Sequence, residues 1–270
     1  MRRRERCGAV TGRIPAFLAV PALLAVAFLV LPLAGLLLRA PWRDAPRLLA
    51  DPAVGAALRL SLLTATAATV LCLVLGIPLA WVLARPALRG RAALRAVVTV
   101  PLVLPPVVGG VALFTVLGRN GVAGRPLYEA TGFAFPFTTA GVVLAEAFVA
   151  LPFLVLSVEG ALRAADRRYE EAAATLGATP WRVFRRVTLP LVAPGVAAGA
   201  VLCWARALGE FGATITFAGN FPGRTQTMPL AVYQALEGAD PRAAVLLSVL
   251  LLAVSVAVLA LLRDRWVSRL

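Results

Sequence analysis

Long runs of apolar residues, almost free of charge, alternate with short polar connections along the chain. Each run is long enough to cross a hydrocarbon core of roughly 30 Å. Only helices or closed barrels satisfy the backbone in lipid, and these runs are too long and too uniformly apolar for barrel strands. The pattern predicts an all-α, polytopic membrane bundle of six transmembrane helices, within Ile14–Leu38, Leu60–Ala84, Ala96–Gly118, Phe133–Val158, Leu189–Ile215 and Ala243–Leu262.

One polar connection, residues 171–190, has the pattern of two helices joined by a tight turn. Gly177 suits the left-handed position that ends a first helix, Thr179 can cap a second, and Pro180 suits the first turn of that helix. An apolar stripe that begins at Trp181 runs along the second helix among arginines. Such an ordered turn in a short loop favours a docked partner, and the alternative is an ordinary amphipathic loop.

The composition is that of a membrane protein, with 60% hydrophobic residues and a mean hydropathy of +0.87. The net charge of +14 comes from arginine, since the chain has no lysine, and 18 of the 27 arginines fall on one side of the predicted spans. The positive-inside rule then places both termini and the loop 164–190 in the cytoplasm. The charge indicates membrane topology and attraction to anionic lipid, not a nucleic-acid partner.

Several residue types that catalysis commonly needs are missing from the chain. There is no histidine, which excludes a His-ligated zinc site and a Ser-His-Asp triad. There is no lysine, which excludes a Walker A phosphate-binding loop. The cysteines, Cys7, Cys72 and Cys203, share no spacing that indicates a metal site or a disulfide. We therefore expect no catalytic residue, no bound metal and no enzyme activity in this chain alone.

The third apolar run contains Pro105, Pro106, Gly109 and Gly110, a combination that breaks or bends a helix. Broken helices at membrane depth are tolerated where protein or a water-filled path satisfies the freed backbone groups. The run therefore indicates either a flexible helix that lines a pathway or a kinked packing helix.

Charged residues inside the membrane are rare and mark function by default. Arg206 and Glu210 are four residues apart in the fifth run, so we expect them to share a helix face. They are candidates for a pathway site, and the alternative is a structural ion pair. Glu146 in the fourth run has no assigned role, and we expect it to be protonated, paired or away from the path.

The connection described above resembles the EAA loop of ABC-importer permeases. That pattern is Glu-Ala-Ala, three residues, Gly, nine residues, then an aliphatic residue, any residue, Leu and Pro. The resemblance implies a type I ABC-importer permease fold, with the loop seated in a groove of a separate ATPase subunit that binds ATP and Mg²⁺. The matching residues, expected to couple to that ATPase, are Glu171, Ala172, Ala173, Gly177, Val187, Leu189 and Pro190.

The stretch Ala205–Glu237 is similar to molybdate permease subunits and less similar to sulfate permease subunits. This resemblance implies a permease that carries molybdate, with a sulfate, thiosulfate or tungstate permease as the alternative and an intramembrane enzyme or scaffold as a remote one. Expected partners are two ATP-binding subunits, an extracytoplasmic molybdate-binding protein, membrane lipid and a second copy of the chain. The third run adds to this resemblance, and an outer loop supplies candidate contacts at Asn220, Arg224 and Thr225.

The chain is expected to divide into three parts. Residues 1–57 would hold a cytoplasmic tail, the first transmembrane helix and an outer loop. The first apolar run is longer than the roughly 7–15 residues of a signal-peptide core, so we interpret it as an uncleaved helix. Residues 58–263 would form the permease domain, which includes the loop 164–190, and residues 264–270 a cytoplasmic tail.

Overall fold

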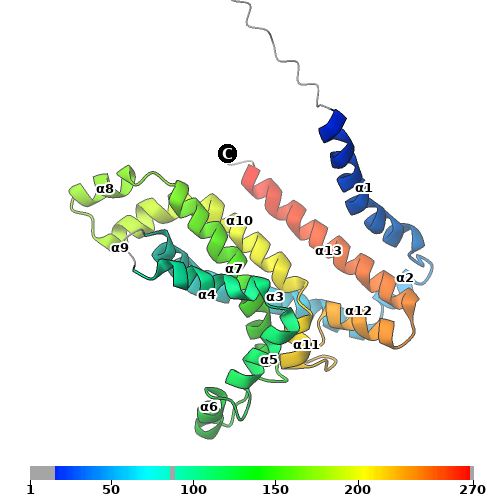
Figure 1. Cartoon of the computed structure of the whole chain (residues 1–270). Helices are drawn as coiled ribbons and strands as arrows, with labels where there is room; N and C mark the ends of the chain where they lie inside the picture. Colours follow the sequence, from blue (N-terminus) through cyan, green and yellow to red (C-terminus); the bar gives the residue numbers. More distant parts are fainter. Residues whose placement is uncertain (1–15, 86–88, 268–270) are drawn as a thin grey trace, which may run out of the picture.

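The computed structural model describes residues 16–85 and 89–267, which form a helical bundle (Figure 1). Among these residues, five helices are long and apolar enough to cross a membrane, and one bent helix pair brings the number to six. The all-α prediction is confirmed, whereas Cys7 and the arginines of the N-terminal tail lie outside the described residues. The long helices are α1 (Ala16–Arg39), α3 (Pro52–Ala84), α7 (Thr139–Ala164), α10 (Leu189–Leu208) and α13 (Pro241–Val267).

The remaining elements are shorter and connect or extend the long helices. The bent pair consists of α4 (Arg91–Val103) and α5 (Pro106–Leu117). A π-helical turn, η1 (Phe184–Thr188), leads directly into α10. The others are α2 (Ala45–Leu49), α6 (Gly124–Thr131), α8 (Arg168–Thr175), α9 (Pro180–Val183), α11 (Gly212–Ala218) and α12 (Met228–Glu237).

The third apolar run is broken rather than straight, because α4 and α5 meet at an angle of 116°. A residue before proline is restricted to extended backbone, and both Leu104 (ψ 133°) and Pro105 (ψ 132°) precede a proline. Pro106 then begins α5, where its missing N–H is not needed. The prolines predicted this break, and the bent pair counts as the sixth candidate span when its two helices are taken together.

The core of the molecule lies where α3, α7 and α10 pack together. Small side chains such as Ala65, Ala68 and Ala150 are buried there and let the helix backbones approach closely. Gly195 and Gly199 of α10 face α7, where Ser157 donates a hydrogen bond to the Gly195 carbonyl oxygen at 3.1 Å. This Gly-x-x-x-Gly pair therefore packs within the chain.

The fifth apolar run also breaks, because α10 ends at Leu208 and a new helix, α11, begins at Gly212. The long helix of this run, α10, therefore lies within the predicted bounds Leu189–Ile215 and ends at Leu208. The Glu210 carboxylate accepts a hydrogen bond from the Ala213 backbone N–H at 2.7 Å, which stabilises the start of α11. Downstream, α12 occupies a stretch whose secondary structure was not predicted from the sequence.

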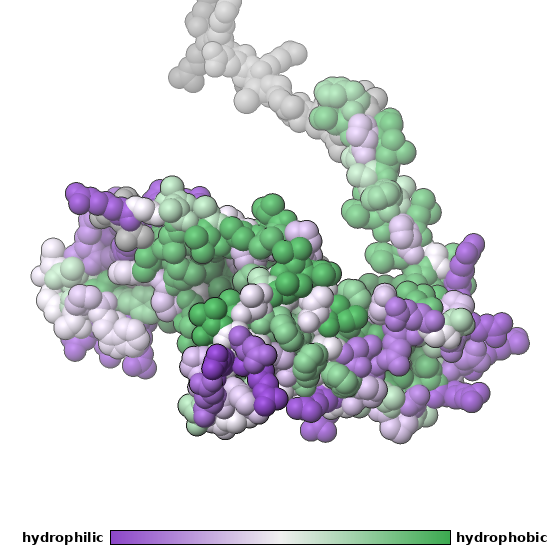
Figure 2. Space-filling model, turned by 60° about the horizontal axis from the view of Figure 1, so that its bottom comes forward, coloured by the Kyte–Doolittle hydropathy of each residue, from purple (hydrophilic) through white to green (hydrophobic). Residues whose placement is uncertain are grey.

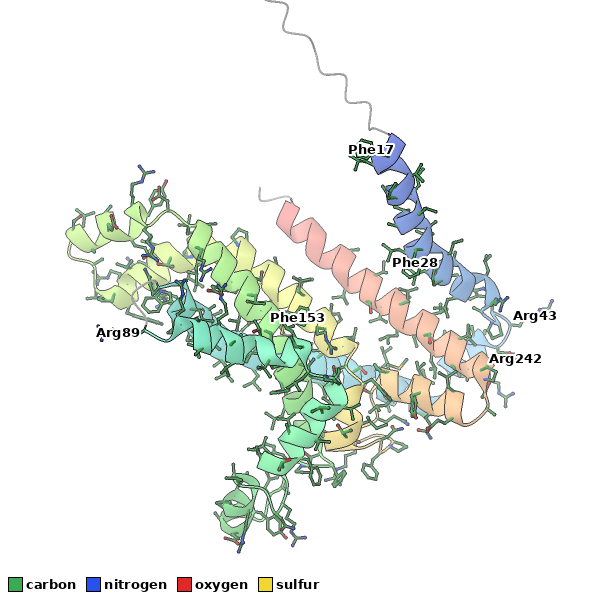
Figure 3. The ribbon with its side chains drawn as sticks, in the orientation of Figure 1. Phe17, Phe28, Arg43, Arg89, Phe153 and Arg242 are labelled. Atoms are coloured by element: carbon green, nitrogen blue, oxygen red, sulfur yellow. The ribbon has the colours of Figure 1, made fainter. Side chains whose placement is uncertain are left out.

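The first helix, α1, lies at the edge of the bundle, beside α13 (Figure 1). None of its most apolar 18-residue window is buried within the chain. Figure 2 shows hydrophobic side chains covering the middle of the molecule and hydrophilic ones gathered at its margins. Arg43 and Arg242 lie together at one end of the bundle and Arg89 at the other (Figure 3). This distribution fits helices surrounded by lipid with arginines at both membrane surfaces.

Candidate functional site

The polar connection between α7 and α10 forms an elbow, which we define as residues 168–188. Its first arm, α8, ends in a Schellman motif, in which the Ala178 N–H bonds the Ala173 oxygen at 3.1 Å and the Gly177 N–H bonds the Ala174 oxygen at 2.9 Å. Gly177 has φ +79°, the left-handed conformation that favours glycine. The predicted turn is therefore confirmed, and it folds α9 back against α8.

The second arm of the elbow is continuous with a membrane helix. Thr179 occupies the cap position of α9 but makes no capping hydrogen bond with its side chain, so its predicted capping role is not observed. Pro180 stands in the first turn, as predicted. Trp181 and Phe184 stack with ring centroids 5.8 Å apart, and Trp181 is 68% exposed. The elbow thus presents an apolar surface directly linked to α10.

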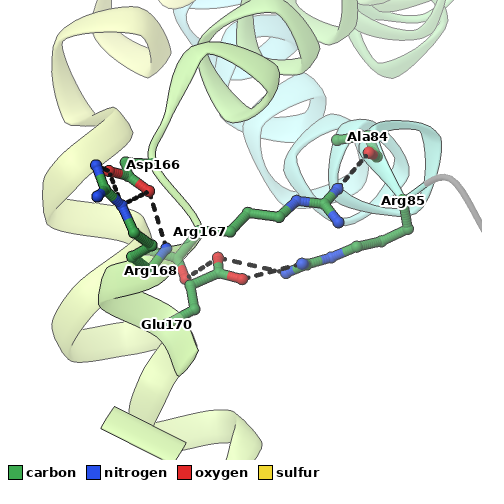
Figure 4. Close-up of polar contacts among 7 residues, drawn as sticks. Ala84, Arg85, Asp166, Arg167, Arg168 and Glu170 are labelled. Atoms are coloured by element: carbon green, nitrogen blue, oxygen red, sulfur yellow. Dashed lines mark hydrogen bonds and ion pairs between the residues drawn. The ribbon is translucent and has the colours of Figure 1, made fainter. Parts of the chain in front are cut away.

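The elbow is fixed to the end of α3 by a cluster of polar contacts (Figure 4). Arg85, immediately after α3, forms an ion pair with Glu170 of α8, with Nη1 and Oε2 2.9 Å apart. Thr188 of η1 donates its hydroxyl to Oε1 of the same carboxylate at 2.7 Å. Arg167 donates to the Ala84 carbonyl oxygen at 3.2 Å, which satisfies a free acceptor at the end of α3.

The charge of Glu170 is stabilised by its partners. Partial burial raises the pKa of this carboxyl, but hydrogen bonds from Arg85 and Thr188 and the nearby positive charges outweigh burial, so the pKa lies below its ordinary value. The Arg85 guanidinium also lies over the Trp81 ring, 4.4 Å from its centroid. Beside these contacts, a pocket of about 300 Å³ is lined by this end of α3 on one side and by the inner side of the elbow on the other.

The residues expected to couple to an ATPase lie along the elbow and its junction with α10. Glu171 and Ala172 are exposed on α8, while Ala173 is half-buried. Val187 belongs to η1 and is half-buried, and Leu189 and Pro190 begin α10. Glu170 was missed by sequence reasoning. It adjoins the motif, but its partner Arg85 is 85 residues away and no local pattern links the two.

Residues 74–270 match the family model described as "Binding-protein-dependent transport system inner membrane component". The chain belongs to this family. The molybdenum transport system permease protein ModB of Mycobacterium tuberculosis is 51% identical to this transport component over 242 residues, 90% of this chain and 91% of that protein. ModB of Escherichia coli is 44% identical over 225 residues, 83% of this chain and 96% of that protein.

A more distant relative and a solved structure complete the comparison of this transport component. The sulfate transport system permease protein CysT of Escherichia coli is 37% identical over 229 residues, which cover 83% of this chain and 82% of that protein. A crystal structure of a bacterial ABC transporter involved in alginate import has a TM-score of 0.71 with 19% identity, and covers 92% of this chain and 93% of that chain. This likeness shows that the transport component has the permease fold.

The proline and glycine pathway candidates of this transport component lie on α5 or at the break before it, where α5 packs against α11. Pro105 and Pro106 form the break before α5, and Gly109 and Gly110 are buried on the face of α5 that packs against α7 and α11. A Cβ added at Gly110 would lie 1.7 Å from the Thr216 hydroxyl oxygen. These two glycines therefore allow close helix packing, while the remaining face of α5 is largely exposed.

Arg206 and Glu210 form the ion pair that their spacing suggests, with Nη2 and Oε2 2.6 Å apart. They do not share a helix, because α10 ends at Leu208 and Glu210 lies in the break before α11. The Glu210 side chain is 1% exposed, whereas that of Arg206 is 26% exposed. Its bond to the Ala213 N–H gives Glu210 a structural role in the break, and part of the Arg206 side chain remains accessible.

Two other predictions concern buried groups. Glu146 of α7 is 1% exposed, and one of its oxygens accepts a hydrogen bond from Thr64 of α3 at 2.9 Å. It is therefore paired with a neutral donor inside the α3–α7 contact. Cys72 and Cys203 are buried in the hydrophobic core, where they pack as small apolar residues.

The outer-loop candidates differ in accessibility. Thr225 is fully buried, and its hydroxyl accepts a hydrogen bond from the Phe221 N–H at 2.9 Å, so it stabilises the loop. Asn220 is half-buried and donates to Gln234 of α12 at 3.4 Å. Arg224 is exposed. Of the three, Arg224 is the side chain best placed to meet a ligand or partner.

Proposed function

We propose that this chain is the transmembrane permease subunit of an ATP-driven importer that carries molybdate across the bacterial cytoplasmic membrane. The elbow carries the transport part of this proposal. It combines an exposed acidic first arm, a Schellman turn and an apolar second arm that continues into a membrane helix. The 51% identity to a molybdenum transport permease supports molybdate as the substrate.

In this proposal, two copies of the chain assemble with two ATPase subunits and an external molybdate-binding protein. Both termini and the elbow face the cytoplasm. Each ATPase subunit binds ATP and Mg²⁺ and grips one elbow, so that hydrolysis takes place on the partner polypeptide. Closure of the ATPases favours one arrangement of the helices and product release favours the other, because a ligand shifts an equilibrium only through its differential affinity for the two states.

The residues that couple this chain to the ATPase would be Glu171, which is exposed, and the backbone set by Gly177. The pathway would run along the exposed face of α5, near the partly accessible Arg206. An arginine is suited to a tetrahedral oxyanion because its planar guanidinium donates paired hydrogen bonds. The division into a first helix and a permease domain over residues 58–263 remains a prediction.

Transport by the reconstituted complex tests the proposal. The chain, its ATPase subunit and its binding protein are placed in liposomes, and uptake of radiolabelled molybdate is followed with ATP inside. We expect ATP-dependent uptake that unlabelled molybdate abolishes and equimolar sulfate leaves nearly unchanged. Equal competition by sulfate would identify a sulfate permease instead. Competition by unlabelled tungstate measures how far the complex distinguishes molybdate from tungstate.

A further inference from the structure

The Glu170 carboxylate joins three segments that are far apart in the sequence. It belongs to the first turn of α8, it binds Arg85 at the end of α3, and it accepts from Thr188 in η1. Arg85 reaches both carboxylate oxygens, at 2.9 and 3.4 Å. A bidentate guanidinium–carboxylate contact fixes the relative orientation of the two side chains as well as the distance between them. One side chain therefore holds both arms of the elbow against α3.

The setting of this contact makes it stronger than an exposed ion pair. The side chains of Arg85 and Glu170 are 30% and 20% exposed, so water screens them only in part. Glu170 also lies in the first turn of a helix, where the positive end of the helix dipole favours an acidic group. The Trp81 ring beneath Arg85 holds the guanidinium in place.

The helix to which the elbow is attached is the central one. α3 packs along both α7 and α10 and supplies much of the buried core. A displacement of the elbow that also moves Arg85 therefore moves α3, in addition to the covalently linked α7 and α10. Among the described residues, the polar link that would remain between this connection and the end of α3 is the hydrogen bond to Ala84 from Arg167, the residue just before the elbow.

We propose that Arg85 and Glu170 are positioning residues that make the elbow and α3 move as one body, so that force from a docked ATPase reaches the core helix. The inference rests on the proposed function, because it assigns how the elbow transmits motion to the membrane helices. It differs from the docking role of Glu171, whose side chain is exposed and makes no such contact within the described chain.

The elbow offers a matched control for the loss of an ion pair. Arg168 pairs with Asp166 at 2.7 Å, but their side chains are 86% and 39% exposed and only one residue separates them. This pair fixes no other segment of the described chain. Asp166→Asn removes a similar charge contact from the same connection without detaching the elbow from α3.

The test compares Arg85→Gln and Glu170→Gln with Asp166→Asn in the reconstituted complex. Three quantities are measured: co-purification of the ATPase subunit, ATP hydrolysis, and molybdate imported per ATP hydrolysed. We expect both variants to keep the ATPase subunit and to import roughly 2- to 30-fold less molybdate per ATP. The control keeps the wild-type ratio. Restoration of the ratio in Arg85→Glu/Glu170→Arg relative to each single reversal would show that the contact itself acts.

A cross-link keeps the proposal testable if a variant fails to assemble. Arg85→Cys/Glu170→Cys, without the native cysteines, is joined by a short bifunctional thiol reagent. Retained uptake after complete cross-linking supports a single moving body, whereas abolished uptake means that the elbow and α3 separate during transport and overturns the proposal. A wild-type ratio in Arg85→Gln also overturns it. Absence of molybdate uptake by the wild-type complex instead refutes the proposed function.

Discussion

Substitution of Gly110 by alanine tests how closely α5 must approach α11. The added Cβ would lie 1.7 Å from the Thr216 hydroxyl oxygen and 2.7 Å from the Ala213 carbonyl oxygen. The hydroxyl can rotate away, but the carbonyl oxygen belongs to the α11 backbone. The two helices must therefore separate by roughly half an ångström or more to restore an ordinary contact.

Two opposing effects set the sign of this change. Alanine in place of glycine within a helix stabilises it by about 0.5–1 kcal/mol, whereas overpacking costs about 1–3 kcal/mol. Because a backbone atom takes part in the clash, we expect the steric cost to exceed the gain. A net loss of 1–2 kcal/mol lowers the ratio of folded to unfolded protein by roughly 5- to 30-fold.

The assay is the midpoint of thermal unfolding in detergent, measured as the loss of the monodisperse peak in size-exclusion chromatography. Gly160→Ala in α7 is the control, because nothing lies within 4 Å of its added Cβ, and its midpoint should equal or exceed that of wild type. Adding Thr216→Ala to the Gly110 variant should recover part of the loss. A Gly110→Ala midpoint equal to the wild-type value would refute the packing argument.

Three further predictions concern the elbow and the topology. A Cβ at Gly177 meets nothing within 4 Å, so Gly177→Val should destabilise the turn by about 1–2 kcal/mol through its backbone conformation alone. Gly177→Val and Glu171→Lys, each as a single variant, should reduce ATPase co-purification and molybdate uptake without preventing membrane insertion. The pKa of Glu170 is lower in the folded protein than in an ordinary glutamate. Its ionised carboxylate therefore stabilises the fold at any pH above the ordinary glutamate pKa, and this stabilisation is lost as the pH falls through the lowered pKa. The thermal unfolding midpoint should therefore fall less on acidification in Glu170→Gln than in wild type. In a cysteine-free background, Leu176→Cys and Val122→Cys, both at highly exposed positions, should react with impermeant thiol reagents from opposite membrane faces, and reaction from the same face would contradict the positive-inside topology.

The membrane helices could be predicted from hydropathy because lipid demands long apolar runs whatever the tertiary packing. The Gly177 turn could be predicted because its conformation is local. The bend after Leu104 followed from two prolines, although its angle did not, because packing between α5 and α11 sets that angle.

The errors arose where a particular side-chain contact, local or distant, decides the structure. The break after Leu208 is stabilised by Glu210, which hydropathy reads only as a charge within an apolar run. Thr225 is polar and sits in a loop, yet it is buried because its hydroxyl bonds the backbone of its own turn. The Arg85–Glu170 contact joins positions 85 residues apart, and a single sequence contains no signal for such a pairing.

The π-helical turn at Phe184–Thr188 has a consequence for insertions and deletions in related sequences. A π turn accommodates one residue more than an α-helical turn, and each residue of an α-helix corresponds to about 100° of rotation. Deleting one residue within Phe184–Thr188 would therefore restore an ordinary α-helical turn, and the first arm of the elbow would keep roughly its present direction around the α10 axis. The same deletion in the regular helix of α10, beside the turn, would rotate the elbow by about 100° and turn Glu171 away from its present direction. The π turn thus lets the joint tolerate the loss of one residue, and an alignment gap confined to it is compatible with an unchanged docking direction of the partner.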